Sequence, residues 1–158
     1  MTDFGKILTS VQESRAKISV AIDTFYSEIE GLLVAVSECP SSTDMWEYRD
    51  RFEEIRAKTY RFKKSTQRNL AEAEFAYNDG MRSSMSKMKS TNGMHFEERN
   101  AEYQTRNITQ YKILDCVKRV VDDVDTFSWY LNGRLRWVKD RQHWLAQREQ
   151  FFAAGDNL

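Results

Sequence analysis

The feature that most constrains this chain is a row of apolar residues that repeats every three or four positions over its C-terminal third. The row consists of Ile108, Tyr111, Leu114, Val117, Val121, Val124, Ser128, Leu131, Leu135, Val138, Leu145 and Phe152. Gln142 interrupts it. Residues at this spacing share one side of an α-helix, so the row predicts a helix over 96–152. Its roughly 45 periodic residues would span about 67 Å, which requires long neighbours to pack against.

Two earlier segments carry the same spacing. The first extends from Phe4 to Val36 and predicts a helix over 3–38, which the pair Cys39-Pro40 should end because the residue before proline avoids the helical conformation. The second begins at Met45 and predicts a helix over 44–78. Gly80 favours a left-handed helix end, so we expect 79–95 to be a flexible break.

Composition supports long helices over a β-fold, because the 158 residues include only one Pro and six Gly. A β-protein of this length would need many more turn residues. We therefore expect an all-α fold: an elongated antiparallel bundle of about three long helices with coiled-coil character, forming one domain over 1–158.

Charge is segregated although the chain holds 24 basic and 24 acidic residues. Acidic residues dominate 23–54, and 55–68 then contains six cations and no acid. The cations are Arg56, Lys58, Arg61, Lys63, Lys64 and Arg68. Such a run is most often a solvated face or one side of a salt-bridge row, but it also suits a phosphate backbone.

A second cationic feature lies in the last predicted helix, within GRLRWVKDRQHW at 133–144 and just beyond it. Arg134, Trp137, Arg141, Trp144 and Arg148 are spaced alternately three and four apart and form one row. Three interpretations fit: bases stacking on the indoles beside phosphates held by arginine, an intersubunit face, or cation–π contacts within the helix. The apolar and Arg–Trp rows together favour self-association or a protein partner.

Residues that carry common catalytic chemistry are sparse. The two histidines, His95 and His143, belong to no HExxH motif, and the chain has no phosphate-binding glycine loop. Cys39 and Cys116 lack metal-site spacing. We expect no enzyme activity, no cofactor and no metal. The chain shows no secretory signal pattern and no apolar run long enough to span a bilayer, so we expect a cytoplasmic protein without a membrane partner.

The layout resembles the phage recombination mediators of the UvsY type. The resemblance covers about residues 55 to 155 and lies in the basic run RAKTYRFKKSTQR, the glycine-containing break, the ion-rich stretch HFEERNAEY and a long amphipathic C-terminal helix. It implies an all-helical, self-assembling protein that binds single-stranded DNA and helps to load a recombinase. It also implies that basic residues of the earlier helix bind the strand, so Lys58, Arg61, Lys63 and Lys64 would be their counterparts here. The acidic N-terminal 54 residues fall outside this pattern.

Two hypotheses follow from these features. The first is a non-catalytic, oligomeric accessory protein that binds single-stranded DNA through the six cations of 56–68 and the Arg–Trp row of 134–148, with a recombinase or another protein as partner. The second is a helical interaction or assembly module, or a small inhibitor of another protein, in which the basic run contacts acidic side chains and no nucleic acid is bound.

Overall fold

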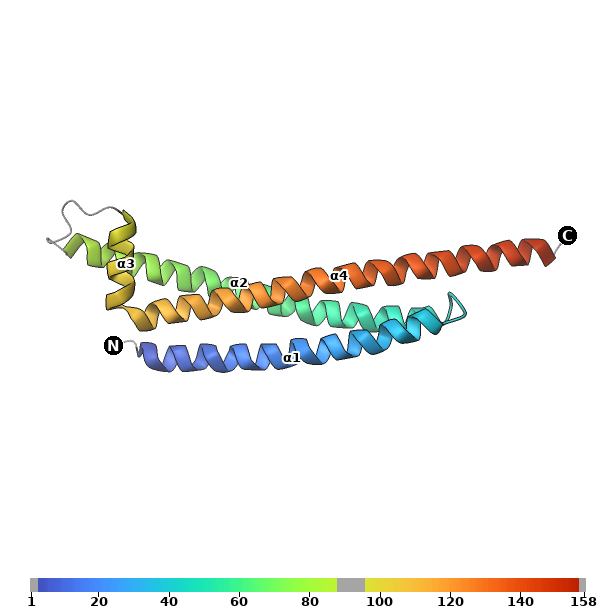
Figure 1. Ribbon diagram of the computed structural model, residues 1–158, viewed down its shortest axis with the longest axis horizontal. Coiled ribbons are helices and arrows are strands. Elements are labelled where there is room, and N and C mark those ends of the chain that lie inside the picture. The colour runs from blue at the N-terminus through green and yellow to red at the C-terminus, as the bar shows by residue number, and fades with distance from the viewer. Residues whose placement is uncertain (1–2, 88–95, 157–158) are drawn as a thin grey trace. The chain divides into compact units, whose positions relative to one another are not determined.

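The computed structural model describes residues 3–87 and 96–156, which form four helices and no strand (Figure 1). The three long helices are α1 (Phe4–Glu38), α2 (Met45–Lys87) and α4 (Ile108–Asp156). The short helix α3 (Phe96–Arg106) precedes α4. The all-α prediction is therefore confirmed for the described residues, and α1 ends directly before the Cys39-Pro40 pair, as predicted.

The chain divides into two compact units. Unit 1 comprises Met1–Ser19 and Lys63–Asp123, and unit 2 comprises Val20–Phe62 and Val124–Leu158. The helices α1, α2 and α4 each contribute residues to both units.

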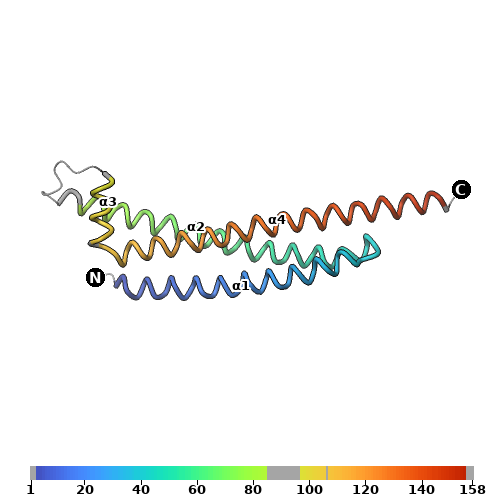
Figure 2. Tube along the Cα trace, in the orientation of Figure 1, coloured from blue at the N-terminus to red at the C-terminus, as the bar shows by residue number. Residues whose placement is uncertain are grey.

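Unit 2 has a closed apolar core in which Ile29, Phe52 and Val138 are fully buried. The ring of Phe25 in α1 stacks against Phe127 in α4, with centroids 5.9 Å apart. Residues 39–44 reverse the chain, so that in this unit α2 runs in the opposite direction to α1 (Figure 2). Each apolar row that the sequence shows in this part of the chain thus faces the rows of the other two helices.

Polar side chains of α4 hold the turn between α1 and α2. The amide of Gln142, which interrupts the apolar row, is buried and donates from Nε2 to the carbonyl of Ser42 at 3.1 Å. Its Oε1 accepts a hydrogen bond from Arg49 at 3.1 Å. Two turns later in α4, Glu149 accepts hydrogen bonds from the hydroxyl and the backbone N–H of Ser42, and these bonds lower the pKa of its carboxyl. The interruption is therefore a buried polar contact that secures the turn.

Unit 1 is built around a smaller cluster of Tyr77, Met81, Tyr103 and Leu114, contributed by α2, α3 and α4. The rings of Tyr77 and Tyr103 meet edge to face at 5.1 Å. Burial raises the pKa of Tyr103, and the neighbouring Tyr77 adds to the effect. The Tyr103 hydroxyl donates to Oε1 of Gln110 at 2.7 Å, so its polar end is satisfied.

The break expected from residue 79 onward is not where α2 ends, because the helix continues through Gly80 to Lys87. Burial of Tyr77 and Met81 on either side of the glycine offsets its low helix propensity. A Cβ at Gly80 would lie 2.5 Å from the Tyr103 hydroxyl oxygen, so glycine permits a close approach here and does not end the helix. The rest of the predicted flexible segment, 88–95, lies outside the described residues.

The helix predicted over 96–152 is divided at Asn107 into α3 and α4, and α3 turns away from the line of α4 within unit 1 (Figure 1). The Asn107 side chain donates to the Tyr103 carbonyl at 3.2 Å, in competition with regular helix geometry. The change of direction lets Tyr103 pack on Tyr77. The apolar row begins at Ile108, so it carried no information about the extension of the helix back to residue 96.

The first half of α1 contrasts with this packing, because none of its described residues up to Ser19 is buried. An apolar groove of about 350 Å³ lies between it and α2 and α4 of unit 1, with Val11, Ile18, Ala73, Ile113 and Val117 in its lining. The small side chains of Ser10, Ser14 and Ala76 also line it, which accounts for the unfilled space. None of the helices described here is both long enough and apolar enough to cross a membrane.

Candidate nucleic-acid interface

Of the six cations of α2 that were predicted to bind a strand, five are exposed and one, Lys63, is half-buried. The apolar row explains this exposure, since Phe52, Ile55 and Thr59 are buried on one side of the helix. Arg61, Lys64 and Arg68 follow one another at intervals of three and four on the opposite side. The structure thus places these three cations on one outer face of α2.

Intramolecular carboxylates neutralise only part of this set. Arg56 pairs with Glu53 at 3.4 Å, and Glu53 also binds Lys139 of α4 at 3.2 Å. Within the described residues, no carboxylate lies within ion-pairing distance of Lys58, Arg61 or Arg68. Lys58, Arg61 and Arg68 are therefore open to an external anion.

The tryptophans of the predicted α4 row are not part of a single-chain core. Trp137 is 41% exposed and Trp144 is 51% exposed. The guanidinium of Arg148 lies 5.5 Å from the Trp144 ring centroid and 5.6 Å from that of Phe152. Arg134 lies over Tyr130 at 5.1 Å. Arg134 and Arg148 thus form cation–π contacts within the helix. The indole rings of Trp137 and Trp144 remain accessible to solvent.

Arg141 has a different role from the one that its place in the row predicted. Its Nε donates to the carbonyl of Val36 at 2.8 Å, and its Nη2 donates to that of Ser37 at 2.7 Å. The last carbonyls of a helix have no partner within the helix, so the Arg141 guanidinium satisfies the C-terminal end of α1. Arg141 is accordingly a structural residue of unit 2, and we remove it from the candidate interface.

Several exposed aromatic residues were missed by the sequence analysis. Trp129 is 82% exposed, Phe151 is 76% exposed and Phe75 is 75% exposed. Trp46 is 53% exposed and carries Arg49 over its ring at 4.8 Å. An arginine three or four residues from an aromatic residue in a helix is the sequence signal shared by the cation–π pairs, and it was applied only to the 134–148 row.

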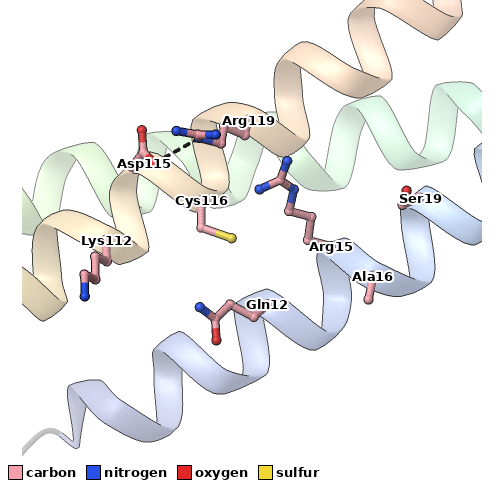
Figure 3. A pocket seen from close by; sticks show the side chains of 8 residues that line it. All are labelled: Gln12, Arg15, Ala16, Ser19, Lys112, Asp115, Cys116 and Arg119. Atoms are coloured by element: carbon pink, nitrogen blue, oxygen red, sulfur yellow. Dashed lines mark hydrogen bonds and ion pairs between the residues drawn. The ribbon is translucent and has the colours of Figure 1, made fainter.

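A polar pocket of about 400 Å³ in unit 1 gathers further cations (Figure 3). Arg15 of α1 and Lys112 and Arg119 of α4 line it, and the thiol of the buried Cys116 points into it. Arg119 pairs with Asp115 at 3.0 Å, and Arg15 pairs with Asp123 at 3.7 Å. Because two of the three cations already have carboxylate partners, this pocket is a weaker anion site than the outer face of α2.

In the described part of the chain, no three His, Cys, Asp or Glu residues lie together as a group that could hold a metal ion. Comparisons with family models, with curated proteins and with solved structures found no match for this chain.

Proposed function

We propose that this chain is a non-catalytic, oligomeric accessory protein that binds single-stranded DNA, in the manner of the phage recombination mediators it resembles. The observation that carries the proposal is the outer face of α2, where Arg61 and Arg68 are exposed and have no carboxylate partner among the described residues. Phosphate groups of a strand would supply the missing negative charge. Trp137 and Trp144 would stack bases, which tolerates any sequence.

Fluorescence anisotropy of a labelled oligonucleotide tests the electrostatic part of this proposal. The double variant Arg61→Glu with Arg68→Glu should weaken binding and reduce the slope of log affinity against log salt by about 1.4, because each phosphate on a single strand contributes about 0.7. The matched control is Lys17→Glu with Lys118→Glu, which makes the same change in charge at two exposed positions elsewhere. Equal affinity of both double variants and the unaltered protein would eliminate the proposal.

Replacing the indoles tests the stacking part. Trp137→Ala or Trp144→Ala should lower oligonucleotide affinity by about 1–3 kcal/mol if each ring stacks one base. Trp129→Ala removes an even more exposed indole from outside the row and should leave affinity unchanged. A loss of affinity for Trp129→Ala alone would place stacking elsewhere on α4.

A second candidate function is a protein-interaction or assembly module, including a small inhibitor of another protein. It is favoured by the exposed Phe151 and Phe152 of α4, a helix whose C-terminal end extends past the α1–α2 turn (Figure 1). Aromatic residues and arginine are enriched at the centres of protein interfaces. Binding of no oligonucleotide even at low salt would leave this candidate in place of the first.

A further inference from the structure

The outer face of α2 carries opposite charges on either side of a small residue. Glu47, Asp50 and Glu54 come before Ala57, and Arg61, Lys64 and Arg68 come after it. All seven residues are exposed and follow one another at intervals of three or four. They therefore form one face of a continuous helix, acidic at one end, basic at the other, with a single methyl group between.

The two ends are nearly mirror images in position. Asp50 lies seven residues before Ala57, and Lys64 lies seven residues after it. Glu54 pairs in the same way with Arg61, and Glu47 with Arg68. The midpoint in sequence of each of these two pairs lies within half a residue of Ala57. A second copy of α2 laid antiparallel over the first, with the two Ala57 side chains at the crossing point, would bring each acid opposite a cation.

We propose that two copies of this chain associate through this face, in a symmetric antiparallel pair centred on Ala57, and that single-stranded DNA competes with the second copy for the same cations. The contact is isologous, so each of the three ion pairs occurs twice. The competition deepens the proposed function and rests on it, whereas the pairing of copies does not.

The charges on this face are incompletely neutralised within one chain. Glu47 and Asp50 form no ion pair among the described residues, and neither do Arg61 and Arg68. Glu54 does bind Arg51, but Arg51 also binds Glu28, so one cation serves two carboxylates. A second copy supplies opposite charge at both ends at once, while a strand supplies it only at the basic end.

The centre of the face allows two helices to approach closely. Ala57 adds only a methyl group, and helix axes in contact are separated by about 8–10 Å, with small side chains at the lower limit. Each exposed ion pair contributes little alone and is screened by salt, so the pairing depends on all six together. The association is therefore expected to be weak and strongly salt-dependent.

A charge exchange between copies tests the pairing. An acid-end variant, Glu47→Lys with Asp50→Lys, has cations at both ends of the face, and a basic-end variant, Lys64→Glu with Arg68→Glu, has acids at both ends. Sedimentation equilibrium at low salt should show the unaltered protein at up to twice the mass of either variant alone. An equimolar mixture of the two variants should regain the larger mass, because all six opposed pairs are again complementary.

Two results would overturn the pairing: a mass unchanged by either variant, or a mixture that stays at the mass of its components. All four positions are exposed, so the variants should fold, and equal helical circular dichroism and melting temperature check this. Lys17→Glu with Lys118→Glu is the control: it leaves the face unaltered, so this variant should have the same mass as the unaltered protein.

A displacement measurement tests the competition. The acid-end variant should bind a labelled oligonucleotide, and adding the basic-end variant should release it as the mixed pair forms. Retention of the strand at full pairing would overturn the competition and leave the pairing intact. If the acid-end variant and the unaltered protein bind no oligonucleotide, the proposed function fails, and the mass measurements still decide whether copies pair.

Discussion

The two halves of α1 carry the same apolar spacing but are packed differently. In the second half, Ile22, Phe25, Ile29 and Val36 are buried, and Ile29 and Val36 have no exposed surface. In the first half no described residue is buried, and Phe4 and Ile7 are 40% and 39% exposed. Periodicity alone therefore does not determine how completely a helix face is covered.

The difference comes from the residues opposite each half. Ile29 lies in a unit whose other helices contribute large side chains, among them Phe52 and Phe127. Ile18 faces a groove to which α2 contributes Thr66, Ala73 and Ala76. Small side chains provide few contact atoms for their neighbours. The α2 residues opposite the first half of α1 therefore leave the groove between the two helices unfilled.

Truncating one isoleucine in each half gives the largest test of this comparison. Ile29→Ala should lower the free energy of unfolding by about 2–5 kcal/mol, because it removes buried methylene groups and leaves a cavity. Ile18→Ala makes the same chemical change beside an existing groove and should cost less than about 1.5 kcal/mol. Urea denaturation measures both values, and equal losses would contradict the difference in packing.

Removing the contact between Arg141 and the end of α1 should have the next largest effect. Arg141→Gln loses two charge-assisted hydrogen bonds to the carbonyls of Val36 and Ser37, at an expected cost of about 1.5–3 kcal/mol. Arg136→Gln, at an exposed position of the same helix, should stay within about 0.5 kcal/mol of the unaltered protein. Oligonucleotide affinity should not change with Arg141→Gln once the protein is folded.

Enlarging a side chain should have opposite signs in the two units. Ala73→Leu extends into the groove of unit 1 and should stabilise the protein by about 0.5–2 kcal/mol. Val138→Leu adds one methylene to the closed core of unit 2, where Val138 is fully buried, and should destabilise it by about 1–3 kcal/mol. Thermal melting gives both signs, and destabilisation by Ala73→Leu would mean that the groove is not available space.

The smallest expected effect is the pH dependence of the turn held by Glu149. Because its folded pKa is lowered by hydrogen bonds from Ser42, its contribution is fully present above the ordinary pKa of 4.5. That contribution is lost as the pH falls through the lower folded value. Glu149→Gln should therefore flatten the stability profile in this acidic range and leave its neutral-pH shape unchanged. An identical acid slope in both proteins would contradict this contribution.

The sequence predicted the helical class, the end of α1 and the buried rows of unit 2, because each depends on local spacing. It did not predict the continuation of α2 through Gly80 or the division at Asn107. Both depend on Tyr103, which lies far from Gly80 in sequence and packs against Tyr77. Packing of the Tyr103 ring overrides the local helix-ending signal at Gly80. The same packing accompanies the division of the predicted helix at Asn107.

The sequence likewise predicted part of the candidate interface and missed another part. A helical pattern with one apolar side indicates that Arg61, Lys64 and Arg68 lie on the other side, and the structure agrees. The same reasoning failed to identify the role of Arg141, because the carbonyls that it binds belong to another helix and backbone acceptors leave no mark in a sequence. Whether a cation faces solvent can be predicted from spacing, whereas its partner cannot.

The contacts of α4 with the α1–α2 turn have a consequence for alignment. Apolar rows that repeat every seven residues can slide past one another by a heptad and still interlock, so they specify sideways contact better than axial position. Gln142 and Glu149 are themselves one heptad apart, yet an amide and a carboxylate bind Ser42 through different atoms. If α4 slipped by one heptad, the Glu149 carboxylate would take the place of the Gln142 amide opposite the Ser42 carbonyl. Two acceptors would then face each other, and this mismatch selects a single register for unit 2.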